Sequence, residues 1–104
     1  MSSTNSLTSN ELKKRYRSIG HSLNPIVTVA GNGLSEGVIA EVNRALDDHE
    51  LIKVKFAIND RATRAEAVAA LCKETGAIDV QQIGKVALIL REAKKPNTKL
   101  SNIR

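Results

Sequence analysis

The residues that could bind a metal ion or act as a nucleophile are few and badly spaced. His21 and His49 have no second ligand at metal spacing, and the His-Glu pair at His49 lacks the second histidine of a zinc-protease motif. Gly84-Lys85 is followed by valine and lacks the first glycine of a P-loop. Cys72 lies on the apolar side of a helical segment and is typical of a small core residue. We therefore expect no catalytic residue, no cofactor, no metal site and no small-molecule substrate.

A glycine-containing loop is the strongest candidate binding site. It joins a β-branched segment, Ile26–Val29, to a segment that Ser35 can cap as a helix. Free backbone amides at such a junction can bind a phosphate, and glycines let a sugar-phosphate chain come close. An ordinary Asn-Gly turn is the alternative. The loop residues with a predicted RNA contact are Ala30, Gly31, Asn32 and Gly33.

Basic side chains in three other segments could neutralise phosphates near this loop. One group lies on the polar side of the first helical segment, where a merely solvated surface is the alternative. Two lysines alternate with apolar residues in a predicted strand, and one follows the glycine of a predicted turn. In chain order they are Lys13, Lys14, Arg17, Lys53, Lys55 and Lys85. The hypothesis requires the glycine loop to lie beside the basic first helix. Asp60-Arg61 and Arg64 are weaker candidates.

Helical and strand patterns alternate along the chain that must position these residues. Helical spacing covers residues 8–20, 35–50 and 60–76, with a capping box at Thr8 and Glu11 and a cap at Asp60. Strand patterns cover residues 26–29, 51–57, 77–82 and 85–91, and the last two should be antiparallel because their link is short. We predict one α/β domain, an N-terminal helix followed by a βαβαββ unit with a mixed four-stranded sheet. The second and third helices should cover one sheet face, and the strand order stays open.

Composition agrees with one globular domain in an intracellular compartment. The chain has 104 residues, of which 41% are hydrophobic and 26% charged. A single cysteine, the lack of a secretory signal and a longest aliphatic run of only Val86–Leu90 predict a cytoplasmic protein without a membrane span. We expect a monomer with a flexible N-terminus at 1–7, a domain at 8–91 and a flexible basic tail at 92–104.

Charge and aromatic content favour contact with a polyanion through its backbone. The formal net charge is +5, but residues 35–50 carry one basic and five acidic residues, so binding should be restricted to one side of the molecule. Aromatic residues make up 2%, and both Tyr16 and Phe56 fall on apolar faces. Stacking of bases on a sheet, as in an RRM, is therefore excluded as the main mode, which leaves phosphates, riboses and shape.

Five short stretches between residues 10 and 91 carry a family resemblance. They are His21-Ser22-Leu23-Asn24-Pro25, Asn32-Gly33-Leu34-Ser35-Glu36-Gly37, His49-Glu50-Leu51-Ile52-Lys53-Val54-Lys55, Lys73-Glu74-Thr75-Gly76-Ala77 and Gln82-Ile83-Gly84-Lys85. On these residues the chain resembles the CRM domain family, whose stand-alone bacterial members are YhbY-like proteins. The resemblance implies RNA binding and a fold similar to the C-terminal domain of translation initiation factor three. The family's G-x-x-G loop falls on residues 30–33, with Ala30 in place of its first glycine.

The resemblance also implies a cellular role and leaves two rivals. Bacterial members of the family are associated with precursors of the large ribosomal subunit. We therefore expect a non-catalytic protein that binds structured ribosomal RNA during assembly of the 50S subunit. One alternative is a protein–protein adaptor on assembly particles that docks through the acidic segment 35–50. The other is a general binder of double-stranded nucleic acid.

Overall fold

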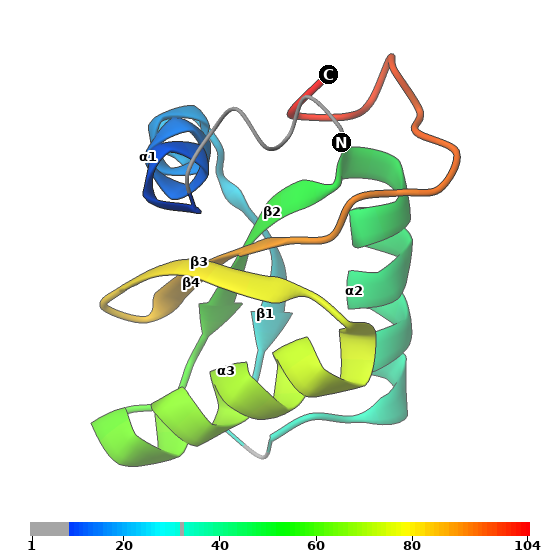
Figure 1. Cartoon of the computed structure of the whole chain (residues 1–104). Helices are drawn as coiled ribbons and strands as arrows, with labels where there is room; N and C mark the ends of the chain where they lie inside the picture. Colours follow the sequence, from blue (N-terminus) through cyan, green and yellow to red (C-terminus); the bar gives the residue numbers. More distant parts are fainter. Residues whose placement is uncertain (1–8, 32) are drawn as a thin grey trace.

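The computed structural model describes residues 9–31 and 33–104, which form a four-stranded sheet with helices on both faces (Figure 1). In chain order the elements are α1 (Ser9–Gly20), β1 (Pro25–Val29), α2 (Glu36–His49), β2 (Leu51–Phe56), α3 (Arg61–Thr75), β3 (Ile78–Ile83) and β4 (Val86–Leu90). The predicted helix and βαβαββ order is confirmed. The expected flexible N-terminus, residues 1–7, and the cap at Thr8 lie outside the described residues.

The strands lie in the order β1-β2-β4-β3, so β2 and β4 are central. β1 and β2 are parallel because α2 connects them as a crossover, while β4 is antiparallel to both neighbours. The link between β3 and β4 is Gly84-Lys85, and Gly84 has φ +57°, which glycine adopts without steric cost. The sheet is therefore mixed, as predicted.

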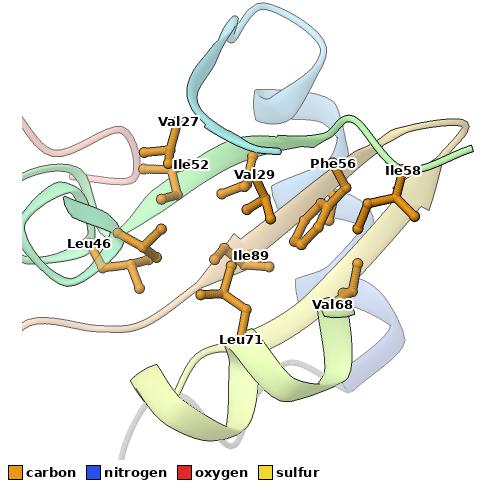
Figure 2. Packing of buried hydrophobic residues seen from close by; sticks show 12 residues of the cluster. Val27, Val29, Leu46, Ile52, Phe56, Ile58, Val68, Leu71 and Ile89 are labelled. Carbon is orange, nitrogen blue, oxygen red and sulfur yellow. The ribbon is translucent and has the colours of Figure 1, made fainter. Parts of the chain in front are cut away.

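The larger core lies between the sheet and the helices α2 and α3. Val29, Phe56, Leu46, Leu71 and Ile89 are fully buried there (Figure 2). Burial of such side chains contributes roughly 1.5–3 kcal/mol each, so this layer accounts for most of the packing stabilisation. The placement of both later helices on one face is thus confirmed.

Helix ends follow local signals in the sequence. The Ser35 side chain accepts a hydrogen bond from Val38 N at 3.1 Å, and Asp60 accepts one from Thr63 N at 2.8 Å. The hydroxyl and amide of Thr63 lower the pKa of Asp60. Gly76 ends α3 in the left-handed conformation with φ +73°. These caps set where α2 and α3 begin and where α3 ends.

α1 packs on the opposite sheet face and covers only part of it. Its Tyr16 side chain joins a second core with Leu51, Leu88 and Leu90, residues near the start of β2 and the end of β4. A Cβ on Gly20 would lie 2.6 Å from Leu88 Cδ2, so a larger residue there would collide with the sheet. The helix ends at this contact and leaves the rest of the face uncovered.

The C-terminal segment packs against the domain, which differs from the expectation of a flexible tail. Glu50 is 0% exposed, and its carboxylate accepts hydrogen bonds from Arg104 at 2.9 and 3.0 Å, Ser101 Oγ at 2.9 Å and Ala93 N at 2.8 Å. Asn102 Nδ2 also donates to Leu51 O at 2.7 Å. A buried carboxylate without such donors would be costly, so the polar segment folds back over it. Chiefly through Arg104, these bonds lower the pKa of Glu50 to about 2.

Candidate nucleic-acid interface

The part of the sheet that α1 leaves uncovered is formed by two rows of paired residues, which we call the open sheet half. Strand pairing aligns one residue from each strand in both rows, and paired residues point to the same face. The first row, at the border with α1, is Pro25, Lys53, Leu88 and Gln81, of which Leu88 is buried under the end of α1. The second row is Thr28, Lys55, Val86 and Ile83.

Two lysines lie at the centre of this surface. Lys53 and Lys55 belong to the central strand β2, where Lys53 is half-buried and Lys55 is exposed. Two strand residues separate their positions by roughly 7 Å. No ion pair among the described residues involves either lysine. Their charges are therefore available to an anion that lies on the sheet.

The glycine loop follows β1 at the edge of the sheet. Ala30 and Gly31 are exposed, whereas Asn32 lies outside the described residues. Gly33 has φ +96°, which requires glycine, and its N–H donates to Ala30 O at 3.0 Å. The Gly33 amide, which we expected to bind a phosphate, is thus engaged within the turn. The exposed backbone of Ala30 and Gly31 remains accessible.

Three connections meet at this edge, which we call the loop edge: the described residues 30, 31 and 33, residues 57–60 and residues 84–85. A Cβ on Gly31 would lie 3.5 Å from Ala57 O, and Phe56 N donates to Lys85 O at 2.6 Å. The ammonium of Lys85 donates to Asn59 Oδ1 at 2.8 Å. Lys85 is thus held beside the connection that follows β2. The loop edge brings together the predicted glycine loop and one predicted lysine.

Two weaker candidates also lie near the loop edge. Arg61 and Arg64 belong to the first turn of α3 and line a cavity of about 290 Å³ with Gly84 and Gln82. Arg61 is exposed, while Arg64 Nη1 donates to Ile58 O at 2.8 Å and is partly used in holding the preceding connection. Arg61 therefore has the freer charge of the two.

The basic residues of α1 do not adjoin the glycine loop, so that part of the hypothesis is wrong. Lys13, Lys14 and Arg17 lie on α1, which precedes β1, whereas the loop follows β1 (Figure 1). The five residues of β1 separate the two by roughly 17 Å. The open sheet half, with its two lysines, occupies the space between them. A ligand that reaches both regions must cross the sheet.

One side of α1 leads to the first row of the open sheet half. Lys13 and Arg17 are four residues apart and so share a side of the helix. His21 N donates to Arg17 O at 3.2 Å, which continues the helical geometry, and His21 lines a cavity with Lys53. Lys14 is exposed elsewhere on α1. Lys13 lies two turns further along α1 from His21, where it lines a cavity with Val80, Leu90 and Glu92, so it is further from the first row than Arg17.

Thr28, Gln81 and His21 belong to this surface although no sequence pattern pointed to them. Their positions depend on strand register and on where α1 ends, and the alternation of residues in one strand does not carry this information. The only signal in the sequence was the lysine pair of β2, whose face could not be assigned. Strand pairing supplies that assignment.

Cys72 and His49 lie outside the open sheet half and the loop edge. Burial raises the pKa of the Cys72 thiol to about 11, and His49 Nδ1 lies 2.8 Å from Leu100 O. Within residues 9–31 and 33–104, no three His, Cys, Asp or Glu side chains are grouped so that they could hold a metal ion. No helix in the same part of the chain has the length and apolarity needed to cross a bilayer.

Comparisons with known proteins find a matching family and similar relatives. The CRS1/YhbY (CRM) domain matches residues 7–91. A protein of Pseudomonas aeruginosa named a probable RNA-binding protein is 54% identical over 93 residues, 89% of each chain. An RNA-binding protein of Haemophilus influenzae is 42% identical over 92 residues, 88% of this chain and 93% of the other.

A solved structure has a similar fold. It is the solution structure of a hypothetical protein from Staphylococcus aureus, described as a candidate RNA-binding protein. The TM-score is 0.76 at 30% sequence identity, and the match covers 90% of this chain and 97% of the other. The single α/β domain is therefore shared with that protein.

Proposed function

The chain belongs to the CRS1/YhbY (CRM) domain family, and on this premise we propose that it is a non-catalytic protein that binds RNA through the open sheet half and the loop edge. The names of the two bacterial relatives support RNA as the ligand. The observation that carries the proposal is the placement of Lys53 and Lys55 on the uncovered face of the central strand, without ion-pair partners among the described residues.

Electrostatics favours the backbone of RNA as the main point of contact. A lysine beside apolar sheet residues attracts a phosphate more strongly than a fully solvated one, because less water screens the charge. Lys85 and the exposed backbone of Ala30 and Gly31 extend the surface at one end, and Lys13 and Arg17 extend it at the other. The sugar-phosphate backbone of the ligand follows β2 over the open sheet half, from the end of α1 to the loop edge.

The dependence of RNA affinity on salt tests this surface. Each lysine that neutralises a phosphate contributes roughly 0.7–0.9 to the slope of log affinity against log salt. We expect Lys53→Ala and Lys55→Ala each to reduce the slope by about that amount. The matched control is Lys73→Ala, which removes the same charge from an exposed position on α3, on the other sheet face. Equal slopes for all three variants would contradict the proposed surface.

We further propose that the RNA is structured ribosomal RNA in a cytoplasmic precursor of the 50S subunit. Support comes from the family resemblance, because bacterial members are associated with such precursors. Sedimentation of a cell lysate through a sucrose gradient should place the protein with precursor particles of the large subunit. The Lys53→Ala, Lys55→Ala double variant should move to the top of the gradient. Competition between structured RNA and duplex DNA at equal salt tests the alternative of general double-strand binding. An RNA-binding protein should keep its RNA, whereas a general double-strand binder should lose it to the DNA.

A further inference from the structure

We propose that a basic cavity between the first turn of α3 and the β3–β4 hairpin binds a further phosphate of the RNA, separate from those on the open sheet half. This inference rests on the proposed RNA-binding function and extends the contact around the hairpin. The cavity measures about 290 Å³ and is lined by Arg61, Arg64, Ala65, Gln82 and Gly84. Pockets for drug-sized ligands measure about 300–1,000 Å³, so this one admits a phosphate with its sugar rather than a longer segment.

Strand register places this cavity on the other side of the hairpin from the open sheet half. Gln82 pairs with Ala87, which is buried in the core beneath α2 and α3, so Gln82 belongs to that face of the sheet. The next residue, Ile83, pairs with Val86 and belongs to the open sheet half. The hairpin tip and the first turn of α3 lie on the same side of the molecule, away from α2 (Figure 1). An RNA that follows β2 to the loop edge reaches the cavity by continuing past the hairpin.

Two arginine side chains give the cavity its positive charge. Arg61 and Arg64 are three residues apart, so they share a side of α3. Arg61 is exposed and forms no hydrogen bond or ion pair among the described residues. Arg64 Nη1 donates to Ile58 O at 2.8 Å, which restrains the guanidinium and leaves its other N–H groups without a partner in the described part of the chain. Guanidinium groups bind phosphate oxygens through parallel N–H donors, so this pair suits a phosphate.

The carboxylates next to these arginines do not occupy them. Asp60 accepts hydrogen bonds from Thr63 N at 2.8 Å and from Thr63 Oγ1 at 2.6 Å, and Asp79 Oδ2 accepts one from Gln82 at 2.5 Å. No ion pair between either carboxylate and an arginine is formed within residues 9–31 and 33–104. Because Asp60 also caps the backbone at the start of α3, the donors for an anion are the two guanidinium groups and not the helix end.

Continuity with the open sheet half favours RNA over an acidic peptide as the occupant. Lys55 pairs with Val86, the residue that follows Lys85. The Lys85 ammonium donates to Asn59 Oδ1 at 2.8 Å, two residues before Arg61 in the chain. Cations therefore follow one another from the central strand, past the hairpin, to the cavity. A sugar-phosphate chain carries one negative charge at every nucleotide and matches such a series.

The dependence of RNA affinity on salt tests the cavity. Arg61→Ala should reduce the slope of log affinity against log salt by roughly 0.7–0.9, the contribution of one phosphate. The matched control is Arg44→Ala, which removes the same side chain from an exposed position on α2 and should keep the slope. Fluorescence anisotropy with a labelled RNA hairpin measures both slopes. An Arg61→Ala slope equal to that of Arg44→Ala would overturn the inference.

A double variant separates this phosphate from those on the open sheet half. Lys55 and Arg61 neutralise different phosphates, so the reductions in slope caused by Lys55→Ala and Arg61→Ala should add. A double variant with the slope of Lys55→Ala alone would show that the two residues share one phosphate, and it would overturn a separate site.

A second measurement locates the contact directly. The Nε–Hε signals of Arg61 and Arg64 in a ¹⁵N correlation spectrum should shift on addition of the RNA hairpin, and that of Arg44 should not. Equal shifts with inorganic phosphate at the same concentration of phosphate groups would indicate a site for free anions. Shifts with a polyglutamate peptide but not with RNA would indicate an acidic protein partner. Either result would overturn the assignment to RNA.

The failure of this inference can be told apart from the failure of the proposed function. Reduced slopes for Lys53→Ala and Lys55→Ala, together with an unchanged slope for Arg61→Ala, would overturn the cavity and leave RNA binding by the open sheet half intact. Failure of the wild-type protein to bind the RNA hairpin would contradict both.

Discussion

Replacement of Glu50 by glutamine should destabilise the protein most at neutral pH, and progressively less as the pH falls from 4.5 towards 2. The Glu50 carboxylate is fully buried and accepts bonds from Arg104, Ser101 and Ala93. Glutamine has nearly the same shape but carries no charge, so Glu50→Gln imitates the protonated carboxyl. The arginine then loses its ionic partner, and one amide N–H group faces donors instead of acceptors.

The size of the effect follows from the pKa of Glu50. Its fall from 4.5 to about 2 corresponds to roughly 3 kcal/mol of stability, present above pH 4.5 and lost as the pH falls to 2. The Arg104 side chain is 37% exposed, so water screens part of this interaction. We therefore expect Glu50→Gln to lower the free energy of unfolding by about 2 kcal/mol at pH 7. The difference from wild type should shrink steadily below pH 4.5.

Urea unfolding followed by circular dichroism between pH 7 and pH 3 measures this difference. The matched control is Glu41→Gln, the same change at an exposed position on α2, which should alter stability little. Arg104→Ala should show the same pH trend, because it removes the largest cause of the lowered pKa. A loss in Glu50→Gln that is the same at pH 7 and pH 3 would refute the electrostatic argument. It would assign the effect to packing instead.

Three further predictions concern single residues. Gly33→Ala should lower the free energy of unfolding by about 1–2 kcal/mol, because φ is +96° there. Gly31→Ala is the control, because a Cβ on Gly31 meets only ordinary contact at 3.5 Å. Thermal denaturation should separate the two variants, and equal losses of stability would count against the argument from φ. Asp60→Ala should lower the urea midpoint through loss of the α3 cap, so an unchanged midpoint would mean that the cap is dispensable. Cys72, with a pKa of about 11, should react with a thiol reagent at pH 8 on the order of 100-fold more slowly than a free thiol, and a rate like that of free cysteine would show the thiol to be exposed.

Local signals in the sequence were enough to predict the elements and their ends. Ser35, Asp60 and Gly76 act within one helical turn of themselves, so their roles depend on neighbours a few residues away. The antiparallel pair β3 and β4 follows in the same way from a short link at Gly84. These features therefore needed no knowledge of the tertiary structure.

Contacts between distant residues could not be predicted in this way. Arg104 and Glu50 are separated by 54 positions, and the polar composition of residues 92–104 gives no sign of packing. The location of the candidate RNA-binding surface also depends on contacts between distant residues. The glycine loop and the basic first helix are close in sequence, but β1 lies between them and carries the chain across the sheet. Only strand register shows that Lys53 and Lys55 fill the gap.

The folded C-terminal segment also changes what the acidic α2 can do. The sequence gives residues 35–50 five acidic side chains, but Glu50 is buried against Arg104 and Asp47 pairs with Arg91 at 2.8 Å. The negative charge available to a protein partner is therefore smaller than composition suggests, which weakens the adaptor alternative. Glu36 and Glu41 remain exposed on α2, which packs on the sheet face opposite the open sheet half. On the proposed function, these two carboxylates disfavour a polyanion beside α2 and so help to orient the protein on its ligand.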